Sequence, residues 1–316
     1  AKCENGYHLH FNEWAEKDMV NMLRHFRNNP SVVMWSIGNE VPSQWDEHGV
    51  EVCRFLQDIC HREDPTRPVT SGMDQPDGGI AYGMSSVLDI PGFNYKPGRY
   101  RELYPLLPQG FILASETAST VSSRGVYHFP AEKAMQKRTE DHQCSSYDLD
   151  YCTWSNIPDE DFAADADLPY MLGQFVWTGF DYLGEPTPYD DASSSHSSYF
   201  GIFDLAGLPK DRYWLYRSRW NETSHTLHLV PHWTFPGREG QVTPVYCYTD
   251  FDEAELFVNG KSQGRRTFDK TSRLDRYRLR WNDVVYEPGE LKVVAYGKDG
   301  KPARAETVRT AGKAAR

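Results

Sequence analysis

Two stretches of the chain share a hydrophobic pattern that ends in polar residues. Residues 31–40 form a run of β-branched and large apolar side chains that begins after Asn29-Pro30 and closes on Asn39 and Glu40. Such a run predicts a strand buried on both faces, as in a parallel sheet covered by helices. Residues 110–116 repeat the pattern and close on Glu116. Both stretches therefore predict strands that carry a carboxylate at their carboxyl end.

Helical and strand periodicities alternate through the first two thirds of the chain. They predict helices over 13–27, 49–61, 100–107, 131–144 and 211–220, and further strands over 69–73, 87–95 and 172–179. Five strands alternating with helices predict an α/β fold, but a closed (β/α) barrel needs eight strands. The chain is either an open α/β sheet or the carboxyl-terminal part of a barrel that lacks three βα units at its front. The polar strand ends favour the barrel, because its active sites form there.

From about residue 231 the pattern changes to a period of two. Apolar and polar residues alternate, or nearly so, over 243–249, 253–260, 277–281 and 289–296. Turns rich in Gly, Asn and Pro separate these segments, including Asn259-Gly260 and Asp299-Gly300. This pattern predicts an antiparallel β-sandwich. The net charge is negative before residue 231 and positive after it, so we expect two domains, 1–228 and 229–316.

Composition and charge narrow the class of ligand. The net charge of −11 argues against a nucleic-acid partner, because no excess of cations is available to neutralise phosphates. No window approaches the length of a membrane span, and the six cysteines lack the spacing of a zinc site. Aromatic residues make up 14% of the chain, and such rings either stack on sugar faces or fill cores.

Two carboxylates at the ends of two barrel strands suit one reaction in particular. Retaining glycoside hydrolysis needs one carboxyl group to protonate the leaving oxygen and another to attack the anomeric carbon. A barrel brings successive strand ends to one rim, so Glu40 and Glu116 can face each other across a sugar despite their separation in the sequence. A Glu40 that caps the next segment or pairs with an Arg would give the same local pattern.

Three blocks of the chain resemble the family-two glycoside hydrolases. Residues 28–40 are similar to the acid/base segment, in which Asn-Glu closes the fourth barrel strand, whereas 111–118 and 173–182 resemble the seventh (nucleophile) and eighth strands. Residues 7–11, 198–207 and 256–261 resemble the β-galactosidase members, whose barrel precedes an immunoglobulin-like sandwich. The resemblance implies an α/β fold made of a partial (β/α)8 TIM barrel, strands four to eight, followed by an immunoglobulin-like β-sandwich.

The resemblance also implies roles for individual residues. Glu40 corresponds to the acid/base and Glu116 to the nucleophile, while Asn39 would bind the sugar 2-hydroxyl. Tyr95 would donate to the nucleophile carboxylate. Trp177 would stack on the sugar and Glu185 would belong to a substrate loop. The alternatives are a structural tyrosine at the rim, a tryptophan that fills the core and a loop glutamate without chemistry.

The function implied is that of a retaining exo-β-glycosidase that removes terminal β-galactose from an oligosaccharide or other β-galactoside by double displacement. We expect no cofactor, no metal, no membrane and no nucleic acid, and a homo-oligomer is compatible with the sequence. Because three barrel strands are missing from the chain, we expect it to be weak or inactive by itself. The alternatives are β-glucuronidase or β-mannosidase activity, or a non-catalytic carbohydrate-binding fragment. The Asn-x-Lys motif of the glucuronidases is not evident in the loops after Trp177.

Overall fold

The computed structural model describes residues 6–314. Its contacts divide the chain into two units, the first made of Ala1–Ala118 and Glu160–Val176 and the second of Ser119–Asp159 and Trp177–Arg316. The second unit thus takes in a segment that lies between two strands of the first. The domain boundary after residue 228 stays a prediction.

The first unit contains a five-stranded parallel sheet whose strands lie in the order in which they occur along the chain. These strands are β1 (Trp35–Asn39), β2 (Val69–Met73), β3 (Ile90–Asn94), β4 (Ile112–Thr117) and β7 (Met171–Val176). The order is typical of a (β/α) barrel wall, whereas in a doubly wound sheet the order reverses at a switch point. Because the strands are parallel, the carboxyl ends of β1, β3 and β4 lie at the same end of the sheet.

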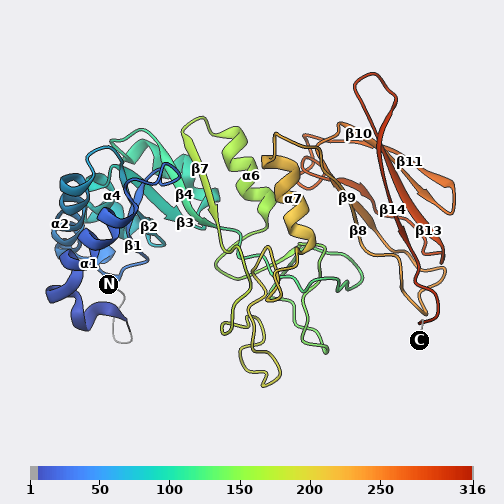
Figure 1. Ribbon diagram of the computed structural model, residues 1–316, viewed down its shortest axis with the longest axis horizontal. Helices are drawn as coiled ribbons and strands as arrows, with labels where there is room; N and C mark the ends of the chain where they lie inside the picture. The colour runs from blue at the N-terminus through green and yellow to red at the C-terminus, as the bar shows by residue number, and fades with distance from the viewer. Residues whose placement is uncertain (1–5, 315–316) are drawn as a thin grey trace. The chain divides into compact units, whose positions relative to one another are not determined.

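Helices cover one face of this sheet (Figure 1). They are α1 (Phe11–Phe26), α2 (Glu47–Glu63), α3 (Pro76–Ala81), α4 (Met84–Val87), α5 (Tyr100–Leu103) and α6 (Pro158–Asp167), with 3₁₀ turns η1 (Tyr7–His10), η2 (Pro42–Trp45), η3 (Pro97–Arg99) and η4 (Tyr104–Leu106). Leu23 of α1 and Ile59 of α2 pack against Trp35 and Val69, while Leu103 of α5 belongs to the same cluster as Phe93 of β3. The helices therefore seal the outer face and leave the strand ends to carry polar groups.

The strand over residues 31–40 differs from the prediction. It begins only at Trp35, and its burial falls off along β1, whereas β2 and β3 are buried throughout. Val33, expected inside, is 62% exposed. The reason is position, since β1 pairs with β2 alone and forms the edge of the sheet. β7, at the other edge, is likewise partly exposed.

The helix expected over residues 131–144 is wrong. This segment instead contains the short strand β5 (Ala134–Met135), which pairs with β6 (Asp150–Tyr151). The Asp150 carboxylate accepts from the backbone N–H of Lys137, and the Tyr189 hydroxyl accepts from that of Thr139. These contacts take the N–H groups that a helix would use, so tertiary partners override a helix-compatible composition.

The carboxyl-terminal part of the second unit consists of two antiparallel sheets. One contains β8 (Leu227–Val230), β9 (Val245–Thr249) and β12 (Leu279–Trp281), and the other contains β10 (Glu253–Val258), β11 (Lys261–Thr267), β13 (Glu290–Tyr296) and β14 (Pro302–Arg309). Asn259 and Gly260 join β10 to β11 with φ values of 47° and 79°, the left-handed backbone that a two-residue hairpin turn requires. Helix α7 (Asp211–Trp220) precedes these sheets.

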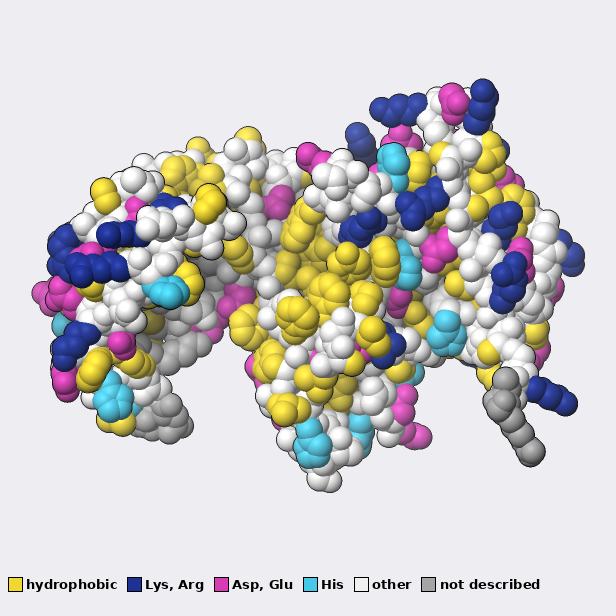
Figure 2. All heavy atoms as spheres, in the orientation of Figure 1, with side chains coloured by type: hydrophobic (Ala, Val, Ile, Leu, Met, Phe, Trp, Pro, Cys, Tyr) yellow, Lys and Arg dark blue, Asp and Glu magenta, His cyan; other side chains and the backbone are white. Residues whose placement is uncertain are grey.

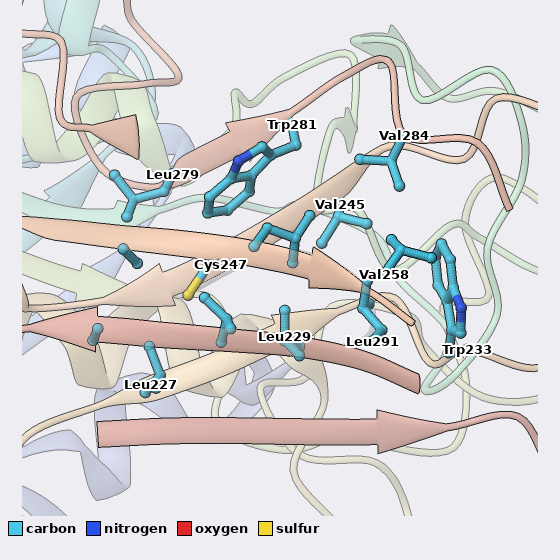
Figure 3. Close-up of a cluster of buried hydrophobic side chains, with 14 of the residues drawn as sticks. Leu227, Leu229, Trp233, Val245, Cys247, Val258, Leu279, Trp281, Val284 and Leu291 are labelled. Carbon is cyan, nitrogen blue, oxygen red and sulfur yellow. The ribbon is translucent and has the colours of Figure 1, made fainter. Parts of the chain in front are cut away.

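The two sheets enclose an apolar core, called here the C-terminal core (Figure 3). Its buried members are Leu227, Leu229, Trp233, Val245, Cys247, Phe251, Ala254, Leu256, Val258, Leu279, Trp281, Val284, Tyr286, Leu291, Val293 and Ala295. The alternation seen in the sequence places these side chains inward, as along β10 and β13, where every second residue is buried. Outward positions carry many charges, and Figure 2 shows Lys and Arg side chains spread over these sheets.

Candidate active site

Six polar side chains meet at the carboxyl ends of β1, β3 and β4. We call this group the rim, and its members are Asn39, Glu40, Asn94, Tyr95, Ser115 and Glu116. The sheet register creates it, because Asn94 of β3 pairs with Glu116 of β4 and Asn39 of β1 pairs with Gly72 of the strand between them. All six residues belong to the first unit.

Two residues of the rim have left-handed backbone conformations. Glu40 has φ 48° and Tyr95 has φ 55°, which in a residue with a side chain costs about 1–3 kcal/mol. Successive side chains of a regular strand point to opposite faces, and this turn lets both Asn39 and Glu40, and both Asn94 and Tyr95, contribute to one hydrogen-bonded group. Backbone hydrogen bonds hold the turns, from Glu40 N to Gly72 O at 2.8 Å and from Tyr95 N to Glu116 O at 2.9 Å.

The side-chain amide of Asn94 lies at the centre of the rim. Its Nδ2 donates to Asn39 Oδ1 at 2.9 Å, to Glu40 Oε1 at 3.0 Å and to Glu116 Oε2 at 3.4 Å. Its Oδ1 accepts from the Ser115 hydroxyl at 2.7 Å. Three acceptor oxygens on one side and a hydroxyl donor on the other fix which end of the amide is nitrogen. One neutral group therefore contacts both carboxylates.

Glu116 has a second donor at the rim. The Tyr95 hydroxyl donates to Glu116 Oε1 at 2.6 Å, so its two carboxylate oxygens face different donors, Tyr95 and Asn94. Hydrogen bonds to a carboxylate favour its ionised form. This arrangement suits a carboxylate that acts as a nucleophile.

Gly72 makes room for the amide. A Cβ added there would lie 2.5 Å from Asn39 Oδ1 and 2.8 Å from Asn94 Oδ1, closer than non-bonded atoms approach. Any side chain at this position would displace one of the two asparagines. The site therefore requires a residue without a side chain at position 72 of β2.

Comparisons with known proteins find similarity to glycoside hydrolases. Residues 6–96 match the family model "Glycosyl hydrolases family 2, TIM barrel domain". A β-galactosidase of Bacteroides ovatus (BoGH2A) is 38% identical over 99% of this chain and 40% of its own length. The solved structure of a β-glycosidase from Bacteroides vulgatus superposes with a TM-score of 0.81 and 31% identity over 97% of this chain and 40% of that one.

The chain belongs to glycoside hydrolase family 2. It contains sequence of the family's TIM-barrel domain and a sheet-rich region, and residues 240–304 of the latter match a domain of unknown function (DUF4982). A β-glucuronidase of Bacteroides fragilis is 25% identical over 91% of this chain and 40% of its own length. The chain thus spans about 40% of the length of these family 2 relatives.

Four of the six site residues predicted from the sequence lie together at the rim of this family 2 chain, namely Asn39, Glu40, Tyr95 and Glu116. Trp177 and Glu185 belong to the second unit. Trp177 is partly buried against a cluster around Phe200, with its ring 6.0 Å from that of Tyr182. Glu185 is exposed and accepts from the Tyr182 hydroxyl. Their roles toward substrate stay predictions.

Three residues of the rim environment were missed from the sequence, namely Asn94, Ser115 and Gly72. Asn94 could have been found, because Asn94-Tyr95 closes its strand as Asn39-Glu40 closes another. Ser115 and Gly72 give no such indication, since their roles depend on the register between neighbouring strands.

Within residues 6–314, no group of three or more His, Cys, Asp or Glu side chains is arranged to hold a metal ion. Over the same part of the chain, no helix has the length and apolar character that crossing a membrane requires.

Proposed function

We propose that the full-length protein is a retaining exo-β-glycosidase that hydrolyses terminal β-galactosides. The observation that carries the proposal is the contact of one amide nitrogen, Asn94 Nδ2, with both Glu40 and Glu116. The two carboxylate oxygens can be no farther apart than the sum of those contacts, 3.0 and 3.4 Å. Two carboxylates this close can face one anomeric carbon, as the carboxyl groups of a retaining pair do at a separation of about 5–5.5 Å.

The first step forms a glycosyl ester. A Glu116 oxygen attacks the anomeric carbon while the bond from that carbon to the leaving oxygen breaks, and the proton of Glu40 passes to the leaving oxygen. In the second step water attacks the anomeric carbon and gives its proton to Glu40, and the ester bond breaks to release the Glu116 carboxylate. Two inversions leave the sugar with its original configuration.

Other rim residues would assist this cycle. The hydroxyl of Tyr95 favours an ionised Glu116 between turnovers. Asn39 uses its Oδ1 to accept from Asn94, which leaves its Nδ2 as the donor for a sugar hydroxyl. We retain Trp177 as a stacking residue and Glu185 as a loop residue near substrate.

Two sugar specificities are supported by relatives of this chain. The Bacteroides ovatus protein named a β-galactosidase is 38% identical, and the Bacteroides fragilis protein named a β-glucuronidase is 25% identical. We favour galactose, because residues 178–210, which follow Trp177, contain no Asn-x-Lys sequence that would hold a sugar carboxylate. A panel of nitrophenyl β-galactoside, β-glucuronide and β-mannoside at equal concentration separates these options, and we expect the largest kcat/KM for the galactoside.

The roles of the two glutamates are tested by one pair of variants. Glu116→Gln removes the nucleophile, and we expect turnover to fall by about 10³-fold or more, equivalent to about 4 kcal/mol of activation free energy. Glu40→Ala removes the acid/base, and added azide should restore part of its activity with an activated aryl glycoside and give a β-glycosyl azide.

Equal residual activity in both variants without rescue by azide would contradict these roles. Sugar binding by the wild-type protein without any hydrolysis would favour the alternative of a carbohydrate-binding protein.

We further propose that the fold is a partial barrel over residues 1–228 and an immunoglobulin-like sandwich over 229–316, and that the chain alone is weak or inactive. The exposed edge strands β1 and β7 support this view, because unpaired edges cost stability in a barrel. Assaying the isolated chain beside the full-length protein tests it. Equal specific activity in the two would contradict the proposal.

A further inference from the structure

The rim contains one buried group that the reaction scheme leaves without a role. Asn94 is fully buried, yet its amide makes four hydrogen bonds to side chains of the site. A buried polar group with this many partners is held in one orientation. Because it contacts Glu40 and Glu116 rather than substrate, it would act through them.

We propose that Asn94 is a positioning residue whose amide serves as a shared hydrogen-bond donor to whichever glutamate is ionised. The inference rests on the proposed function. In double displacement the negative charge alternates, with Glu116 ionised before the first step and Glu40 ionised while Glu116 is esterified. Asn94 Nδ2 is within reach of both, at 3.0 Å from Glu40 and 3.4 Å from Glu116.

The chemical identity of the shared group matters. The amide has two N–H donors and three acceptors around it, so its hydrogen bonds can strengthen toward one carboxylate and weaken toward the other as the charge moves. A lysine in this place would stabilise both glutamates as anions and would oppose the protonated form that the acid needs. A neutral amide supports each ionised state in turn without excluding the protonated state of the other.

Two neighbours hold the amide of Asn94 in its orientation. The Ser115 hydroxyl donates to Asn94 Oδ1 at 2.7 Å, which turns Nδ2 toward the glutamates. Gly72 leaves the space that the amide occupies. Ser115 therefore provides a matched control, because its removal loosens the orientation of the amide while keeping both N–H donors.

The test compares Asn94→Ala, Asn94→Asp and Ser115→Ala in the full-length protein. An aryl galactoside with a good leaving group gives the glycosylation rate from the stopped-flow burst and the deglycosylation rate from steady-state kcat. For Asn94→Ala we expect both rates to fall by about 10²-fold, because both carboxylates lose their alignment, with KM changed by only a few-fold. For Ser115→Ala we expect both rates to fall by less than in Asn94→Ala.

Asn94→Asp replaces the amide with a carboxyl group of nearly the same shape. Its negative charge opposes ionisation of the neighbouring glutamates, so the acidic limb of the kcat/KM profile should move to higher pH. The variant also lacks both N–H donors of the amide, so both rates should fall as they do in Asn94→Ala. Because this variant keeps the volume of the side chain, it also tests the inference if Asn94→Ala fails to fold.

The outcomes separate the inference from the proposed function. Wild-type protein without β-glycosidase activity would refute both. Active wild-type protein together with an Asn94→Ala variant that retains kcat, or that slows in one step only, would refute the shared donor alone. An Asn94→Asp variant that keeps both wild-type rates would also refute the shared donor alone.

Discussion

The rim of the parallel sheet and the C-terminal core are built in opposite ways. At the rim, two residues have a left-handed backbone, and buried Asn94 is surrounded by polar partners. In the C-terminal core, regular alternation along β10 and β13 places apolar side chains together. The rim concentrates charge and backbone strain, whereas the core removes apolar surface from water. We therefore expect changes at the rim to affect turnover and changes in the core to affect stability.

The largest stability effect is expected for Trp281→Ala. The Trp281 ring is 2% exposed, and its Nε1 donates to Gly264 O at 2.8 Å. Removing it should lower the free energy of unfolding by about 3–5 kcal/mol, because a cavity replaces the ring. Urea unfolding followed by circular dichroism measures this loss. A fall in kcat at temperatures where the variant is folded would contradict the expectation that changes in the core affect stability and not turnover.

A second effect comes from a charged cluster beside the core. His228 contacts Asp211 at 2.7 Å and Glu306 at 3.6 Å, and its ring stacks on Trp214. Burial alone would lower the pKa of His228, but the hydrogen bonds to Asp211 and Glu306 raise this pKa to about 9. The raised pKa means that the cluster stabilises the fold fully below pH ~6.5 and loses this contribution as the pH rises toward ~9.

The difference in unfolding free energy between wild type and His228→Gln, measured from pH 6 to 10, isolates this contribution. We expect the difference to shrink by up to about 3 kcal/mol across that range. Lys210 has the opposite effect on stability. Burial lowers its pKa to about 8, so the cost of burying its charge decreases as the pH rises above about 8. His225→Gln is the control, since its imidazole is 67% exposed. A difference that stays constant with pH would contradict the role of His228.

The smallest effect is expected at two adjacent valines. Val284 is 3% exposed and belongs to the C-terminal core, whereas Val285 is 43% exposed. Val284→Ala should cost about 1–3 kcal/mol of unfolding free energy and Val285→Ala less than about 0.5 kcal/mol. Thermal unfolding of both variants measures the contrast. Equal shifts would mean that burial does not set the stability of this region.

Much of the fold follows from hydrophobic periodicity. The strand predicted over 69–73 and the helix predicted over 211–220 agree with the bounds of β2 and α7. β11 was missed because it is an exposed edge strand in which Lys261, Arg265 and Arg266 replace an alternating pattern. The helix expected over 131–144 does not form because hydrogen bonds to Asp150 and Tyr189, both later in the chain, hold the backbone of this segment. Local pattern cannot specify such partners.

In the candidate site too, some residues could be predicted from the local sequence pattern, whereas others depend on neighbouring strands. Glu40 and Glu116 stand out in the sequence because a carboxylate at the end of an apolar strand is unusual. The role of Asn94 depends on strand register, on the left-handed turn at Tyr95 and on the missing side chain at Gly72. These features arise only when three strands lie side by side. Sequence therefore predicts the two glutamates that we propose to be catalytic more readily than the amide between them.

The most direct test of the proposed retaining mechanism is to trap its covalent intermediate. The full-length protein would be incubated with an activated 2-deoxy-2-fluoro-β-galactoside, and its peptides analysed by mass spectrometry. We expect one fluorosugar per chain, attached to the peptide that contains Glu116, and no label in Glu116→Gln. Attachment to another residue, or release of sugar with inverted configuration and no label, would contradict the assignment of Glu116 as the nucleophile.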